Sequence, residues 1–307
     1  MKRTGKTPYL KRKAEIEMSF IYNHKTYLAN LAKRKERKKS RQQPDTLLRD
    51  IRLYFTYEVP NTYFYLFNFT QVIRKILQQK NFYCPGYSHI YISIGENEKE
   101  AIARAYELED WYRFGIAVLP KDDFFNCPDE KREHQILQTI ANGLYDIAEL
   151  DHLDKKALKE AIAQANEWGL FHERIIQQKE NRKFCFRMSS MPVRNSHEEE
   201  IYFTLIDRDE AKEYKWKFGQ LFLLEACWWF FKITVTNKVI RTKPRARMEL
   251  VLKGKKKELE MTIESIKNGT GHITIADVNV PIEPWILELE EKLKYTPPEE
   301  MKNSSSS

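Results

Sequence analysis

The sequence lacks the short motifs by which many enzymes are recognised. Its 307 residues include only ten glycines, and they form neither a glycine-rich phosphate-binding loop nor a Gly-x-Ser-x-Gly motif. The four cysteines lie far apart, and no histidine stands at zinc-ligand spacing from them. We therefore expect no cofactor and no metal, and the sequence favours a protein without catalytic function. A catalytic site assembled from distant residues stays open as an alternative.

Apolar segments long enough to span a membrane are also missing. The most apolar run, Leu221 to Val235, is shorter than the roughly 20 residues that a transmembrane helix needs, and it contains Glu225 and Lys232. We interpret this run as one buried strand. No apolar segment of a secretory signal follows the basic first residues, and widely spaced cysteines are typical of a reducing compartment. We therefore expect a cytoplasmic protein that does not bind membranes.

Positive charge is concentrated in two stretches of the chain. The net charge is +8, yet residues 1–45 carry +10 and residues 232–257 carry +9, which leaves −11 on all other residues. Charge that is segregated in this way implies an anionic partner, either an acidic protein or a nucleic acid. The sequence does not indicate an oligomeric state.

The first stretch contains a dense run of cations. The run consists of Lys33, Arg34, Lys35, Arg37, Lys38, Lys39 and Arg41. It is typical of a nucleic-acid-binding arm or a nuclear-localisation-like patch, and the plain alternative is a solubilising leader. Because no aromatic residue is interleaved, the run by itself would contact only a phosphate backbone. Because its cations repel one another, we expect residues 1–45 to form a flexible arm.

The second stretch contains cations at every second position. These are Arg241, Lys243, Arg245 and Arg247. On a strand all four would point to one face, about 7 Å apart, while Ile240 and Thr242 point to the other. That spacing suits successive phosphates of a nucleic acid or a ladder of carboxylates on a protein. The plain alternative is a solvated outer face or a guarded sheet edge, and Pro244 fits an edge.

Hydrophobic periodicity predicts an α+β fold. Within residues 46–169, strand-like and helical segments alternate in an order compatible with a parallel sheet. The strands are expected at 51–59, 90–94 and 114–119. Asn97 is expected to cap the helix before the third strand, with Glu100 as its reciprocal partner. Two further helices, capped by Asp129 and Asp154, are expected to form a helical hairpin that ends at Gly169.

The hydrophobic period changes to two after Gly169. Alternating segments are found at 184–188, 201–205, 239–252 and 259–263, and Asn268-Gly269 is predicted to form a turn into a segment with Ile273 and Ile275. We therefore expect residues 170–296 to form a mostly antiparallel sheet, closed by a helix at about 284–295. Residues 297–307 are too poor in apolar side chains to pack and are expected to be a disordered tail.

The helical part of the chain at 130–169 contains Glu130-Lys131-Arg132, Ile136-Leu137, Gly143-Leu144, Ile147-Ala148, Asp154, Leu158, Ala161 and Trp168-Gly169. This pattern is similar to a helical segment of small bacterial immunity proteins that neutralise polymorphic toxins. The resemblance covers about 40 of the 307 residues. It implies a non-enzymatic cytoplasmic protein that occludes a toxin surface without a cofactor, and it identifies no contact residues.

Two functional hypotheses follow from the sequence. The first is a binding protein that engages an acidic partner through its basic surfaces, with toxin neutralisation as its role. The second is a nucleic-acid-associated protein that uses residues 33–41 and 241–247 as phosphate contacts. Nucleic-acid binding should weaken steeply with salt, whereas protein recognition should depend on a few buried anchors.

Overall fold

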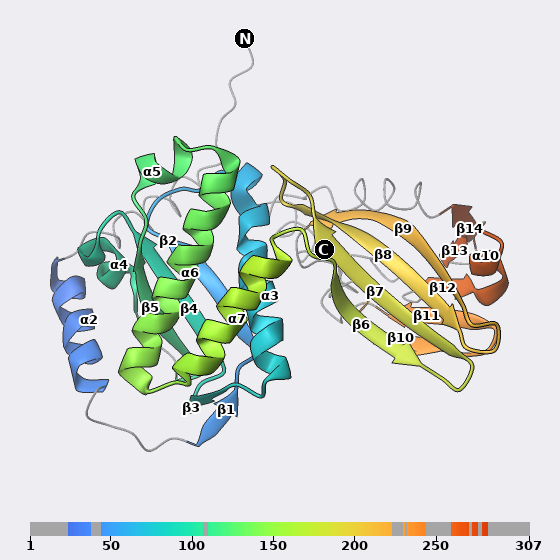
Figure 1. The fold of residues 1–307 in the computed structure, drawn as a ribbon, viewed down its shortest axis with the longest axis horizontal. Coiled ribbons are helices and arrows are strands. Elements are labelled where there is room, and N and C mark those ends of the chain that lie inside the picture. Colours follow the sequence, from blue (N-terminus) through green and yellow to red (C-terminus); the bar gives the residue numbers. More distant parts are fainter. Residues whose placement is uncertain are drawn as a thin grey trace, which may run out of the picture. The chain divides into compact units, whose positions relative to one another are not determined.

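The chain divides into two compact units, Met1–Leu170 and Phe171–Ser307. The computed structural model describes residues 24–37, 44–106, 110–222, 230, 232–243, 259–269, 272–275 and 278–281. The first unit contains a parallel sheet with helices, and the second contains antiparallel sheets (Figure 1). The α+β fold expected from the sequence is confirmed.

A three-stranded parallel sheet organises the first unit. Its strands, in spatial order, are β2 (Asp50–Phe55), β4 (His89–Gly95) and β5 (Tyr112–Val118). The predicted parallel pairing is confirmed for both neighbouring pairs. Because side chains alternate along a strand, the register places Arg52, Tyr91 and Phe114 on one face of the sheet. Two short strands, β1 (Asp45–Leu47) and β3 (Tyr83–Pro85), pair in an antiparallel ladder. In the chain, β1 comes just before β2 and β3 comes just before β4.

Helices cover both faces of this sheet. The helices of the first unit are α2 (His24–Arg37), η1 (Asn61–Phe67), α3 (Asn68–Gln79), α4 (Glu98–Arg104), α5 (Lys121–Phe125), α6 (Asp129–Asp151) and α7 (Lys155–Trp168). In Figure 1, α3, α6 and α7 lie in front of the sheet. Helix α6 approaches β5 through two glycines, since a Cβ on Gly115 would lie 2.0 Å from the carbonyl oxygen of Gly143. On the other face, Ala101 and Ile102 of α4 pack with Tyr91.

Two of the three predicted helix caps are confirmed. Asn97 accepts a hydrogen bond from the Glu100 amide at 3.0 Å, and Asp154 accepts one from the Ala157 amide at 2.9 Å. The prediction for Asp129 was wrong, because Pro128 occupies the N-cap. Asp129 lies in the first turn of α6 and instead binds the buried guanidinium of Arg132 at 2.5 Å.

Helix α2 lies within residues that we expected to be a flexible arm, so that expectation was wrong for residues 24–37. The cause is tertiary neutralisation of its charge. Arg34 and Arg37 pair with Asp146 and Asp151 of α6, each at 2.5 Å, which offsets the repulsion within the cationic run. Asn30 is buried and donates a hydrogen bond to the carbonyl of Ile102 at 3.1 Å.

The second unit consists of two antiparallel sheets. One contains β6 (Arg174–Glu180), β7 (Phe184–Pro192), β8 (Glu198–Asp207) and β9 (Lys212–Phe222) in this order. The other contains β10 (Lys232–Val235), β11 (Val239–Lys243), β12 (Leu259–Thr262), β13 (His272–Ile275) and β14 (Val278–Pro281), and α10 (Ile263–Lys267) follows β12.

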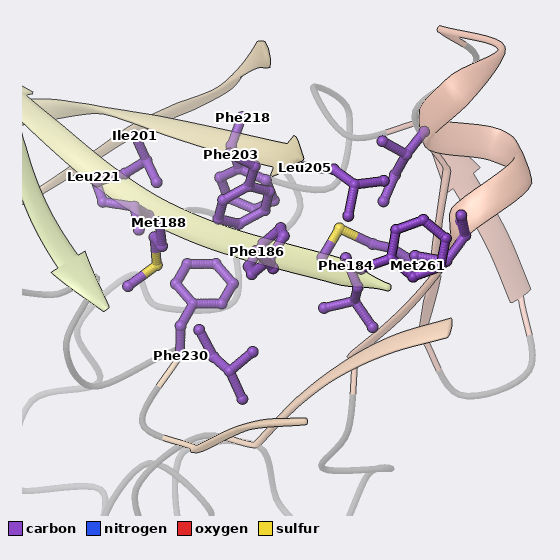
Figure 2. Packing of buried hydrophobic residues seen from close by; sticks show 14 residues of the cluster. Phe184, Phe186, Met188, Ile201, Phe203, Leu205, Phe218, Leu221, Phe230 and Met261 are labelled. Atoms are coloured by element: carbon purple, nitrogen blue, oxygen red, sulfur yellow. The ribbon is translucent and has the colours of Figure 1, made fainter. Parts of the chain in front are cut away.

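One hydrophobic cluster joins these two sheets. It includes Phe186 of β7, Phe203 of β8 and Phe218 of β9 on one side, and Ile240 and Met261 of the other sheet (Figure 2). All five side chains have at most 1% of their surface exposed. The alternation that predicted the inward face of 184–188 and 201–205 is therefore confirmed.

Two local predictions in this unit were wrong. Residues 221–235 do not form one strand, because β9 ends at Phe222 in the first sheet and β10 begins at Lys232 in the second. The strand predicted to run through Ile263 ends at Thr262, which caps the helical turn of α10 that starts at Ile263. The turn predicted at Asn268-Gly269 is confirmed, and it leads into β13. The helix expected at 284–295 and the tail at 297–307 lie outside the described residues.

Candidate partner-binding surfaces

The alternating cations lie on β11, and the described part of this strand has the predicted orientation. Ile240 and Thr242 are completely buried, whereas Arg241 and Lys243 are exposed. The outward orientation of these two cations is therefore confirmed. The other two predicted members of the row, Arg245 and Arg247, lie outside the described residues.

The neighbouring strands add charge to the same face. Lys232 of β10 lies opposite Lys243, and Glu260 of β12 lies opposite Arg241. The Arg241 Nε donates a hydrogen bond to Glu260 Oε2 at 2.6 Å, and half of the arginine side chain is exposed. We call Lys232, Arg241, Lys243 and Glu260 the cationic sheet face. It carries three positive charges and one negative charge.

The ion pair on this face restrains Arg241 only weakly. Exposed pairs typically contribute about 0–1 kcal/mol, because water screens the two charges and long side chains lose entropy when they are held. Arg241 could therefore exchange Glu260 for the carboxylate of a partner at little cost. The net positive potential of the face would attract such a partner before contact.

The cationic run on α2 is divided between inward and outward side chains. Arg34 and Arg37 bind acids of α6, and only 11% and 14% of their side chains are exposed. Lys33 and Lys35 are exposed on the same helix. Lys38, Lys39 and Arg41 lie outside the described residues. In the described part, the two arginines thus attach the helix to its own unit, and the two lysines face solvent.

A cluster of rings and guanidinium groups that no sequence motif predicts lies at the start of the parallel strands. The indole of Trp111 is 45% exposed, and its centroid lies 4.8 Å from that of the His89 ring. The Arg52 guanidinium lies 5.8 Å from the centroid of Tyr91. These residues come from three strands or their flanks, so a local motif search could not find them. In the sequence, this cluster is indicated only by the aromatic residues within the individual strands.

Two strongly shielded ion pairs in the second unit are structural. Arg174 binds Glu199 at 2.7 Å, with 8% and 1% of the side chains exposed. Asp207 has no exposed side-chain surface and accepts from Lys267 of α10. Burial acts to raise the pKa of Asp207, but the hydrogen bonds from Lys267 and from two backbone amides outweigh it and lower this pKa. The first pair links β6 to β8 across β7, and the second links β8 to α10.

Other kinds of site have little support within the described ranges. No group of three His, Cys, Asp or Glu side chains there is arranged to hold a metal ion. None of the helices in that part of the chain combines the length and the apolar character needed to cross a bilayer. A shallow hollow of about 280 Å³ is lined by Phe171, Met191, Pro192, Val193, Arg194 and Glu200. Its lining contains no arrangement of nucleophile and base.

Comparisons with protein-family models, with curated proteins and with solved structures found no match for this chain. The residues of the immunity-protein resemblance are mainly packing residues here. Ile136, Leu144 and Ile147 are fully buried, and Gly143 provides the close approach of α6 to β5.

Proposed function

We propose that this protein is a non-enzymatic cytoplasmic binding protein that engages an acidic protein partner, and that this binding neutralises a toxin. The observation that carries the proposal is the cationic sheet face. Three cations point outward from paired strands around a single carboxylate, Glu260. An ordered sheet presents these charges at fixed spacings, which suits recognition of carboxylates on a folded partner.

The distribution of charge over the molecule supports a specific surface. Outside residues 1–45 and 232–257 the chain carries a net −11, so a strongly acidic partner would be repelled by most of the protein. The basic stretches would therefore attract such a partner most strongly and would set its orientation. The toxin role is supported by the resemblance of residues 130–169, which form α6 and α7.

The test combines charge reversal with a toxicity assay. An adjacent toxin gene is expected, and its product serves as the probe. Co-expression with the wild-type protein should restore growth, and the purified proteins should bind. The variant Lys232→Glu/Arg241→Glu should bind at least about tenfold more weakly, since each reversal converts attraction into repulsion. The matched control is Lys179→Glu/Arg182→Glu, which changes two exposed cations elsewhere in the same unit.

Equal protection by the wild type and by the Lys232→Glu/Arg241→Glu variant would contradict the assignment of the surface. Absence of a toxin gene beside this one would contradict the toxin role. An equal loss of toxin binding in the Lys179→Glu/Arg182→Glu control would show that binding depends on total charge and not on the cationic sheet face.

Nucleic-acid binding is the second candidate function. The observation that favours it is the cluster of rings and guanidinium groups on β2, β4 and β5, because base recognition needs ring faces in addition to charge. The cations of α2, which the sequence predicts as phosphate contacts, support nucleic-acid binding less, since Arg34 and Arg37 are bound to acidic residues of their own unit.

A further inference from the structure

The backbone holds Trp111 firmly at the edge of the parallel sheet. Its carbonyl accepts hydrogen bonds from the amides of Ser88 at 3.0 Å and His89 at 3.2 Å. The next residue, Tyr112, begins β5 in register with His89 of β4 and Asp50 of β2. The indole is therefore positioned by two strands, and binding would not require a loop to become ordered around it.

Other rings support the indole and leave part of it open. The centroids of His89 and Tyr112 both lie 4.8 Å from that of Trp111, and their planes are close to perpendicular to it, at 86° and 79°. Burial keeps the pKa of His89 below its usual value, so this imidazole is an uncharged ring at neutral pH. The indole is 45% exposed, so it has surface available for a planar ligand.

Two arginines lie beside these rings. The Arg52 side chain is 55% exposed and pairs with Asp50 at 2.6 Å. Arg49 is also exposed. Both are close enough to His89 for their charges to contribute to lowering its pKa. Planar guanidinium groups bind phosphate oxygens in a bidentate manner, whereas Asp50 is a single carboxylate that neutralises only part of this charge.

We propose that Trp111, Arg49 and Arg52 form a binding site for single-stranded nucleic acid. A base stacks on the exposed indole, and the two guanidinium groups bind the phosphates that flank it. A duplex keeps its bases stacked on one another and would leave the indole unused. A chain of acidic residues such as poly-glutamate would satisfy the arginines but would offer the indole no aromatic ring to stack on. The site lies in the first unit and shares no residue with the cationic sheet face.

The experiment measures binding of the full-length protein to fluorescein-labelled oligonucleotides by anisotropy. The probes are a 12-nucleotide thymidine strand, the corresponding uridine strand and a 12-base-pair duplex, and poly-glutamate is the acidic polypeptide probe. Trp111→Ala should weaken single-strand binding by roughly 5- to 100-fold, the range expected for loss of one stacked base. Trp111→Phe retains a ring and should stay within about threefold of the wild type.

Further variants separate stacking from charge and from folding. Arg49→Gln/Arg52→Gln should weaken binding and reduce the slope of log affinity against log salt by about one to two, because up to two phosphate contacts are lost. Ile175→Ala is the apolar control, since Ile175 is 42% exposed and lies in the other unit. Lys121→Gln is the cation control, because Lys121 is an exposed residue of α5, which follows the other end of β5. Circular dichroism checks that each variant is folded.

Several outcomes would overturn the proposal. One is the absence of single-strand binding at low salt, and another is a folded Trp111→Ala variant that binds as tightly as the wild type. Duplex bound as tightly as the single strand would exclude base stacking. Poly-glutamate binding that depends on Trp111, without oligonucleotide binding, would assign the surface to an acidic polypeptide. Loss of single-strand binding on changing Lys232 and Arg241 alone would move the nucleic-acid site to the second unit.

Discussion

Replacing Arg34 with glutamine should weaken the attachment of helix α2 to the first unit. Arg34 Nη2 lies 2.5 Å from Asp146 Oδ2, and Nη1 donates a hydrogen bond to the carbonyl of Phe114 at 3.1 Å. The same oxygen of Asp146 accepts from the Ile116 amide at 2.7 Å. The exposed fractions of the two side chains are 11% and 31%, so water screens this pair less than a surface ion pair.

The magnitude follows from the groups that lose a partner. Hydrogen bonds that involve a charged group contribute about 1.5–3 kcal/mol, and exposed pairs contribute about 0–1 kcal/mol. Arg34→Gln removes one charged pair of intermediate burial and weakens one bond to a carbonyl, while Asp146 retains the Ile116 amide. We expect the free energy of opening α2 to fall by about 2 kcal/mol. Lys33→Gln changes an exposed neighbour and should alter it by less than about 0.5 kcal/mol.

Hydrogen exchange measured on peptides from residues 24–37 reports this local opening directly. A double-mutant cycle with Arg34→Gln and Asp146→Asn isolates the pair, and a coupling energy of about 1–2 kcal/mol is expected. A coupling energy below about 0.3 kcal/mol would show that the ion pair does not hold the helix. Equal hydrogen-exchange protection of α2 in the Arg34→Gln and Lys33→Gln variants would show the same.

Three further predictions concern the cores of the two units. Gly115→Ala should lower stability by about 3 kcal/mol in thermal unfolding, because its Cβ would lie 2.0 Å from the Gly143 carbonyl oxygen; an unchanged midpoint would contradict this packing. Thr242→Val should raise stability by about 1 kcal/mol in urea, since the buried hydroxyl has no hydrogen-bond partner among the described residues; a loss of stability would point to an unseen partner. The pKa of Asp207 is lowered because hydrogen bonds from Lys267 and the backbone outweigh its burial, so its stabilising contribution is present above the unfolded value of about 3.9 and is lost as pH falls through and below it. In the Asp207→Asn variant the free energy of unfolding should therefore fall less steeply with decreasing pH below about pH 4. The same pH dependence of stability in the variant and the wild type would contradict the lowered pKa of Asp207.

The features that could be predicted from the sequence are those set by neighbouring residues. The alternation of Ile201, Phe203 and Leu205 identified the inward face of β8, because a strand whose one face is buried repeats every two residues. Asn97 and Asp154 were recognised as caps because a cap needs only an acceptor next to the first free amides.

The features that could not be predicted depend on residues far apart in the chain. Arg34 meets Asp146 across 112 positions, so the repulsion visible in the sequence was no guide to the stability of α2. The rings of His89 and Trp111 meet only because β4 and β5 pair in parallel. Leu221, Phe230 and Ile233 of the apolar run are buried in the one core that both sheets share, and apolar character does not indicate where the chain changes sheets.

The cations of α2 have two different roles, so variants that test partner binding must change only some of them. Arg34 and Arg37 are needed to hold the helix, so their replacement would reduce binding of any ligand by disturbing the fold. Lys33 and Lys35 are exposed and can be changed without that effect. A variant that removed the whole run would therefore confuse stability with recognition. Only exposed cations, on α2 and on the cationic sheet face, can report whether an acidic partner binds, and each surface has to be tested separately from the other.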